Sequence, residues 1–164
     1  MHFLYNTLSL SLKAVTTIKG RNTLPLTPFY FIRHSETDWN NRNIIMGSND
    51  IPLNELGLRQ AHEASQLLKK ESFDVIISNT KLRARQTADI IAKATKKPIL
   101  FEEGLTERIW GEAEGQPVDS TKSLFDDEHT PQGAETFSAF QQRILETTFF
   151  ITFVRQTWAW RKNM

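Results

Sequence analysis

Short apolar runs alternate with segments of helical spacing from Phe29 onward, and this alternation limits the chain to one class of fold. Short continuous apolar runs are typical of buried strands, whereas apolar residues three and four apart indicate helices. Strands separated by helices predict an α/β domain with a mostly parallel, buried sheet. We expect strands at residues 29–32, 75–77, 99–101 and 149–154, and helices at residues 55–70, 83–94 and from about residue 134.

The length and composition fit one globular domain and exclude several other classes. The chain has 164 residues, 39% of them hydrophobic, and no cysteine, which excludes a disulfide framework, a thiol nucleophile and a cysteine-ligated zinc site. Its longest apolar runs are far shorter than the ~20 residues that a membrane span needs. The net charge is +1, without the concentrated basic face of a nucleic-acid-binding protein. We therefore expect a cytoplasmic protein with neither nucleic acid nor membrane among its partners.

The two ends of the chain differ in character from the part between them. Residues 1–28 carry basic side chains and no acid, and they lack the apolar run and cleavage site of a secretory signal. We expect a poorly ordered leader there, with a targeting peptide as the alternative. Residues 155–164 are basic and rich in tryptophan, and we expect an unrelated tail. This leaves one domain at residues 29–154.

Polar side chains follow each of the first three predicted strands. Ligands of parallel sheets bind beyond the carboxyl ends of the strands, where these side chains would meet. Arg33, His34 and Asn40 follow the first strand, Arg83 lies in the first turn of the helix after the second, and carboxylates follow the third in residues 105–115. Arginine forks and a helix amino end bind phosphate, and a neutral histidine can attack phosphorus. Each feature alone also fits a solvated surface, and only their combination indicates a phosphate-binding site.

Five segments, in order along the chain, carry a family resemblance. Residues 33–40 read Arg-His-Ser-Glu-Thr-Asp-Trp-Asn, close to an Arg-His-Gly-Glu-Thr-x-x-Asn signature. Residues 78–88 match Ser-x-x-x-x-Arg-Ala-x-x-Thr-Ala, and residues 105–115 match Leu-x-Glu-x-x-x-Gly-x-x-Glu-Gly. Residues 47–61 and 133–136 match the segments between and after these. The chain resembles the histidine phosphatase superfamily, in its phosphoglycerate mutase-like branch, over nearly all of the predicted domain.

The resemblance implies a three-layer α/β fold with a mostly parallel central sheet, and phosphoryl transfer through a phosphohistidine. His34 would be the phosphorylated nucleophile. Arg33 and Arg83 would bind the transferred phosphoryl group, and Asn40 would add an amide donor. Glu107 would protonate the leaving oxygen and later activate water, which requires a raised pKa because an ordinary glutamate is ionised at pH 7. The substrate would be a small phosphomonoester, with no metal or cofactor needed because the arginines supply the positive charge.

The sequence departs from the family pattern at two places. Ser35 stands where the signature has glycine, which accepts backbone angles that serine resists. The family's second histidine, in a Ser-His-Gly run after a later strand, has no counterpart, and Gln156 stands near its place. His62 and His129 are poor substitutes, since the first lies on a predicted helix and the second in an acidic loop. Losing one such donor typically costs on the order of 10²–10³ in rate.

We therefore expect the domain to be incomplete at its C-terminal end and its activity to be impaired. Three interpretations stay open: a phosphatase or mutase, a non-catalytic relative that binds phosphate compounds, and a nonfunctional fragment. Because the chain has no obvious long insertion that would mark a dedicated mutase, a phosphatase is favoured among enzymes. The sequence does not predict an oligomeric state.

Overall fold

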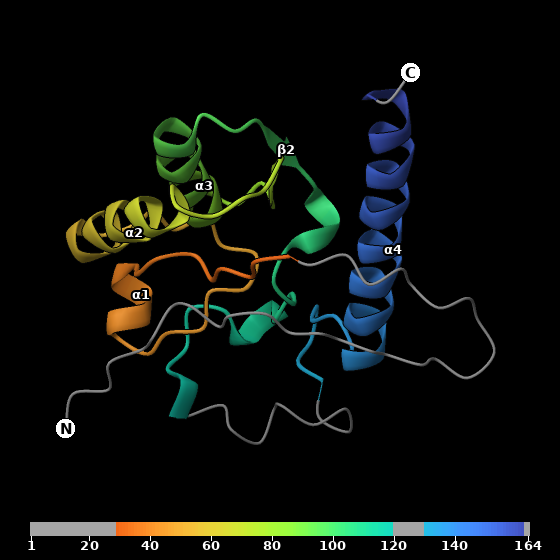
Figure 1. Cartoon of the computed structure of the whole chain (residues 1–164). Helices are drawn as coiled ribbons and strands as arrows, with labels where there is room; N and C mark the ends of the chain where they lie inside the picture. The colour runs from red at the N-terminus through yellow and green to blue at the C-terminus, as the bar shows by residue number, and fades with distance from the viewer. Residues whose placement is uncertain (1–28, 120–129, 163–164) are drawn as a thin grey trace. The chain divides into compact units, whose positions relative to one another are not determined.

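The structure is a computed structural model that describes residues 29–119 and 130–162 (Figure 1). It divides into two compact units. One unit is His34–Ile144, which holds the sheet and the candidate site. The other takes in Arg33 and the residues before it, together with Leu145–Met164. The predicted leader and His129 lie outside the described residues.

A parallel β-α-β unit forms the centre of the unit His34–Ile144. Strand β1 (Ile76–Ser78) pairs in parallel with strand β2 (Ile99–Phe101), with Ile76 opposite Ile99. Helix α3 (Leu82–Thr95) connects the two strands, as a parallel pair requires. These elements lie within two residues of their predicted positions, and the α/β class is confirmed.

Helix α2 (Glu55–Leu68) packs against α3. A Cβ at Gly57 would lie 2.0 Å from the carbonyl oxygen of Glu36, so only glycine allows this close approach. Leu56 and Leu67, which belong to the apolar pattern of the sequence, are 41% and 46% exposed. The buried positions recur at helical spacing and are mostly small: Gly57, Ala61, Ser65 and Leu68.

The segment before α2 belongs to the core, although it contains only one short helix, α1 (Asp38–Asn41). Three apolar side chains along it are buried, those of Ile45, Met46 and Leu53. The segment therefore has fixed neighbours on its inner side. This matters for the site because the backbone of the same segment contacts α3.

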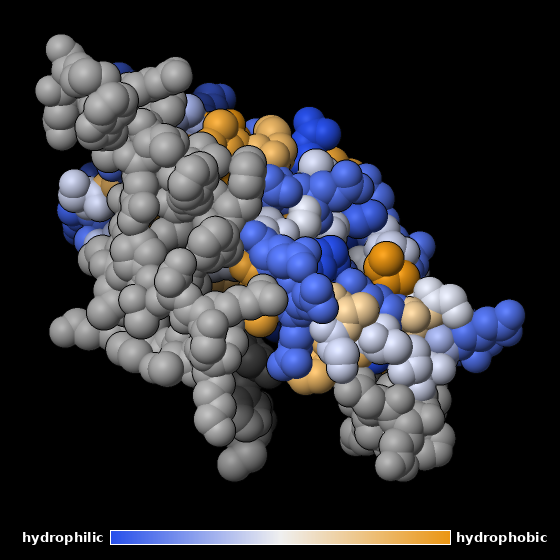
Figure 2. All heavy atoms as spheres, turned by 90° about the vertical axis from the view of Figure 1, so that its right-hand side faces the viewer, coloured by the Kyte–Doolittle hydropathy of each residue, from blue (hydrophilic) through white to orange (hydrophobic). Residues whose placement is uncertain are grey.

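The acidic region after β2 contains short turns. It forms two 3-10 turns, η1 (Glu103–Leu105) and η2 (Gly111–Ala113). Strand β2 itself leaves Leu100 and Phe101 52% and 46% exposed, and the Arg85 guanidinium lies 5.3 Å from the centre of the Phe101 ring. In the view of Figure 2, apolar surface of this kind occurs in separate patches between hydrophilic side chains.

Residues 29–32, predicted as the first buried strand, form no strand in the structure. Phe29 is 53% exposed and Phe31 is 67% exposed. An apolar run favours an extended chain, but of residues 29–32 Phe31 alone takes part in a β-bridge, which pairs too few backbone N–H and C=O groups for a strand. The prediction of a buried strand here is therefore wrong.

Residues 149–154, predicted as a fourth strand, lie inside helix α4 (Phe137–Lys162). That prediction is wrong because neither glycine nor proline interrupts the sequence of this helix, and aromatic and β-branched residues lower helix propensity only slightly. Gln156 consequently lies within a helix and not after a strand. Although α4 has 26 residues, neither it nor any other described helix is long and apolar enough to cross a membrane.

An ion pair between Glu135 and Arg143 fixes the loop that precedes Glu107. Arg143 Nε and Nη2 donate to the two carboxylate oxygens of Glu135 at 2.9 and 2.7 Å. Its Nη1 donates to the carbonyl oxygens of Gly104 and Thr106 at 2.9 Å each. The hydrogen bonds from Arg143 hold the pKa of Glu135 below its usual value, although desolvation acts in the opposite direction.

We expect Glu135→Gln to lower the free energy of unfolding by about 1–3 kcal/mol at pH 7. Because the pKa of Glu135 is lower in the folded chain, the stabilisation is present above the unfolded value of 4.5 and is lost as the pH falls through the folded value. Urea unfolding of the wild type and the variant from pH 7 to pH 3 measures this difference. The exposed Glu63 gives a control variant, Glu63→Gln. A cost for Glu135→Gln that does not shrink towards pH 3 contradicts the prediction.

Candidate active site

A buried arginine at the start of α3 forms the base of the candidate site. Arg83 is 2% exposed, and its Nη1 and Nη2 donate to the carbonyl oxygens of Asn49 and Gly47 at 2.7 and 2.9 Å. Nη2 also lies 3.0 Å from Oε2 of Glu107. The two carbonyls fix the plane of the guanidinium. On the side where Glu107 lies, the guanidinium still presents positive charge.

Glu107 lies beyond the carboxyl end of β2 and keeps access to solvent. Its side chain is 41% exposed, in contrast to that of Arg83. The structure thus brings together one arginine and one glutamate that the sequence places after neighbouring parallel strands. Their phosphate-binding and acid–base roles stay predictions.

His34 is half-buried, and a hydrogen bond to the next residue sets its tautomer. Its Nδ1 lies 2.8 Å from the carbonyl oxygen of Ser35. A carbonyl oxygen can only accept, so Nδ1 carries the hydrogen and the lone pair of the neutral ring is on Nε2. Nε2 is therefore the ring nitrogen that could act as a nucleophile, and that role of His34 stays a prediction.

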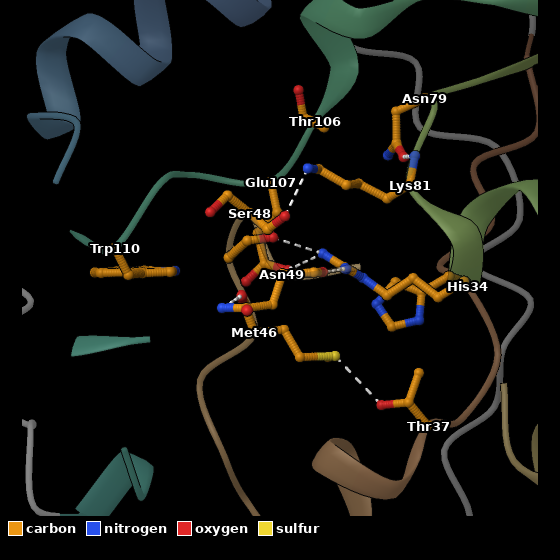
Figure 3. A network of polar contacts seen from close by, with 12 residues as sticks. His34, Thr37, Met46, Ser48, Asn49, Asn79, Lys81, Thr106, Glu107 and Trp110 are labelled. Carbon is orange, nitrogen blue, oxygen red and sulfur yellow. Dashed lines mark hydrogen bonds and ion pairs between the residues drawn. The ribbon is translucent and has the colours of Figure 1, made fainter. Parts of the chain in front are cut away.

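The backbone of Ser35 connects the histidine loop to the helical turn that carries Arg83. Ser35 N donates to Oγ1 of Thr87 at 3.1 Å, and that hydroxyl donates to the carbonyl oxygen of Arg83 at 2.8 Å. Figure 3 accordingly shows His34 in the same cluster of side chains as Glu107. Among the described residues, Ser35 is not one of those with positive φ, so serine fits where the family signature has glycine.

Asn40 has a structural role that the sequence analysis missed. It closes a capping box on α1, in which its Oδ1 accepts from the backbone N and the Oγ1 of Thr37 at 3.1 and 2.9 Å. The Thr-x-x-Asn spacing is itself a signal for such a cap. The capping contacts fix the amide with Nδ2 as its remaining donor, and donation to a phosphoryl group stays a prediction.

The other residues considered from the sequence do not join these contacts in the described structure. Arg33 is exposed and is the last residue of the other unit, so its role stays a prediction. His62 is exposed on α2. In the described part of the chain, no three His, Asp or Glu side chains form a group that could hold a metal ion.

Lys81 is a further cation at this site that sequence reasoning did not single out. It stands at the amino end of α3, and its Nζ donates to the carbonyl oxygen of Ser48 at 2.6 Å. Three successive carbonyls, those of Gly47, Ser48 and Asn49, therefore accept from two cations at the amino end of α3. No sequence pattern signals these contacts, because they join residues more than 30 positions apart.

The sequence of the chain matches one family model and several named proteins. A family model described as Histidine phosphatase superfamily (branch 1) matches residues 29–151. A Bacillus subtilis (strain 168) protein named uncharacterized phosphatase PhoE is 36% identical over 120 residues, which are 73% of this chain and 62% of that protein. A Yersinia pestis (strain Pestoides F) protein named probable phosphoglycerate mutase GpmB is 41% identical over 91 residues, which are 56% of this chain and 42% of that protein.

The fold comparison points the same way. The solved structure of Bacillus stearothermophilus YhfR superposes with a TM-score of 0.65 at 32% sequence identity, covering 73% of this chain and 64% of that one. This chain thus spans less than two thirds of each of these three relatives. From the match over residues 29–151 we conclude that the chain belongs to the histidine phosphatase superfamily, branch 1.

Proposed function

We propose that this chain takes the phosphoryl group of a small phosphomonoester onto Nε2 of His34. The observation that carries the proposal is the Nδ1 hydrogen bond to the Ser35 carbonyl, which directs the nucleophilic lone pair to Nε2. Nε2 attacks phosphorus, the bond from phosphorus to the substrate oxygen breaks, and Glu107 gives that oxygen a proton. Water then attacks the phosphohistidine, Glu107 accepts a proton of that water, and the phosphorus–nitrogen bond breaks to release phosphate.

Arg83 supports this chemistry because its charge is already fixed before a substrate binds. Two of its hydrogen bonds go to backbone carbonyls, and the third goes to the exposed Glu107. A phosphoryl oxygen that takes the Nη2 hydrogen replaces Glu107 there and leaves the carboxyl group beside the phosphate. Preorganised charge of this kind stabilises the transferring group without reorganisation during the reaction.

A non-catalytic phosphate-binding protein is the second candidate. It is favoured by one observation, which is that the sequence contains no Ser-His-Gly run to supply the second histidine of the family pattern. Such a protein would keep the anion contacts of Arg83 but turn over slowly or not at all.

A direct assay separates the two candidates. The wild type and His34→Ala are compared for hydrolysis of a generic aryl phosphate and for binding of inorganic phosphate. Turnover above that of the variant supports the phosphatase. Phosphate binding without such turnover supports the second candidate, and the absence of both contradicts the two together.

We expect Glu107→Gln to change binding and turnover in opposite directions. The neutral amide no longer competes with phosphate as an anion at Arg83 Nη2, so inorganic phosphate should bind about threefold to tenfold more tightly. An amide cannot deliver the proton, so aryl phosphate turnover should fall about 100-fold. The exposed Glu103 offers a matched control, Glu103→Gln, with neither effect. Weaker phosphate binding in Glu107→Gln would show that Glu107 does not compete for Arg83.

The remaining expectations from the sequence belong to the same proposal. These are the phosphate contacts of Arg33 and Asn40, a phosphatase in preference to a mutase, chemistry without a metal, and a cytoplasmic location. The proposed partner is a small phosphorylated substrate.

A further inference from the structure

We propose that Glu114 is a positioning residue, which holds the segment Gly47–Asn49 in the one arrangement that fixes Arg83 for phosphate. Its connection to phosphate rests on the proposed function. Its effect on the arginine does not, because that effect follows from contacts within the chain.

The carboxylate of Glu114 accepts hydrogen bonds from three residues of two separate segments. Oε1 accepts from the backbone N of Ser48 at 2.8 Å and from the backbone N of Trp110 at 3.0 Å. Oε2 accepts from the Ser48 hydroxyl and from Nδ2 of Asn49, both at 2.7 Å. Four donors converge on two oxygens, which is the full acceptor capacity of a carboxylate. An amide has only one accepting oxygen, so glutamine cannot reproduce this set.

The same short segment turns its carbonyl groups towards α3. The carbonyls of Gly47 and Asn49 accept from Arg83, and the carbonyl of Ser48 accepts from Lys81. The segment therefore donates to Glu114 and accepts from the two cations at the amino end of α3. One peptide group joins the two sets directly: its N–H, that of Ser48, donates to Glu114, and its carbonyl, that of Gly47, accepts from Arg83. Hydrogen bonds that continue through a peptide group polarise one another, so the contact to Glu114 strengthens and orients this contact to Arg83. Figure 3 shows Ser48 and Asn49 within this network.

The packing leaves the segment little room to move towards Glu114. Gly47 has a φ of +49°, and a Cβ there would lie 2.1 Å from Oε1 of Glu114. Glycine is therefore required at this position for two reasons: it adopts the left-handed backbone without strain, and it has no Cβ that would clash with the carboxylate. Without the carboxylate, the segment loses what holds it on that side, and the Arg83 guanidinium loses its fixed plane.

Glu112 supplies a matched control two residues away. Its side chain is exposed on η2, so Glu112→Gln changes the charge as Glu114→Gln does and leaves the segment Gly47–Asn49 in place. Each variant is titrated with inorganic phosphate, and the Arg83 side-chain N–H exchange is measured by NMR without phosphate. Thermal unfolding of each variant separates a loss of stability from a loss of affinity.

We expect Glu114→Gln to weaken phosphate binding about tenfold and Glu112→Gln to leave it unchanged. In an Arg83→Lys background, Glu114→Gln should weaken binding less than twofold further, because its effect passes through the arginine. If Glu114→Gln fails to fold, Ser48→Ala and Asn49→Ala each remove one donor and should each weaken binding severalfold.

Two results would overturn this assignment. The first is a phosphate affinity of Glu114→Gln equal to that of Glu112→Gln. The second is a loss of phosphate affinity on Glu114→Gln that is as large in the Arg83→Lys background as in the wild type. A purely structural role lowers the unfolding temperature without this dependence on Arg83. If the wild type binds no phosphate, the proposed function fails. Faster N–H exchange of Arg83 in Glu114→Gln alone would then still support the positioning role, and unchanged exchange would contradict it.

Discussion

Arg83→Ala is expected to weaken inorganic phosphate binding about 100-fold and to lower the free energy of unfolding by about 2–4 kcal/mol. The first effect follows from the loss of the buried cation that would face the phosphoryl oxygens. The second follows because the carbonyls of the buried Gly47 and the half-buried Asn49 lose their charged donor. Both effects arise from one side chain that is 2% exposed.

Phosphate titration and urea unfolding measure the two effects separately, with Arg85→Ala as the control. Arg85 lies on the same helix but is exposed, with its guanidinium over the Phe101 ring. Its removal should cost less than about 1 kcal/mol and leave phosphate affinity unchanged. Similar phosphate affinities for the two variants would mean that Arg83 is a structural cation and does not bind phosphate.

His34→Asn is expected to lower aryl phosphate turnover by at least about 10³-fold while phosphate affinity changes only severalfold. The asparagine amide can still donate to the Ser35 carbonyl, which retains the local backbone contact. It has no ring nitrogen with a lone pair to attack phosphorus. The substitution therefore removes the nucleophile and leaves the anion contacts of Arg83 intact.

Steady-state hydrolysis and phosphate titration of His34→Asn separate these two effects. The exposed His62 gives the control, His62→Asn, which should match the wild type in both measurements. A turnover in His34→Asn equal to that of His62→Asn would exclude His34 as the nucleophile.

The β-α-β unit could be predicted from the sequence because its signals are local. The two apolar runs predicted at residues 75–77 and 99–101 became the strands β1 and β2, and the segment between them carried the spacing of α3. The run at residues 149–154 has the same composition as a strand but lies inside α4. Composition alone cannot decide whether such a run forms a strand or a helix. Where no glycine or proline separates the run from a preceding helix, the helix can continue through it.

The candidate site likewise has one part that the sequence could predict and one part that it could not. Arg83 could be placed near the carboxylates of residues 105–115 because they follow neighbouring strands of the same parallel pair. Among those carboxylates, only the family resemblance singled out Glu107. Glu114 and Lys81 could not be assigned, since their roles depend on the backbone of Gly47–Asn49, far away in sequence. In particular, an acidic residue in a loop is usually solvated, and nothing in the sequence shows that Glu114 accepts four hydrogen bonds.

Transfer of a labelled phosphoryl group to His34 tests the central claim most directly. The chain is incubated with a ³²P-labelled aryl phosphate, quenched in alkali because phosphohistidine is labile in acid, and digested for peptide mapping. A slow second step does not weaken this test, since it preserves the phosphohistidine. We expect acid-labile label on the peptide that contains His34 and none in His34→Asn. Label that persists in His34→Asn, or no label in a wild type that hydrolyses the substrate, would contradict the claim.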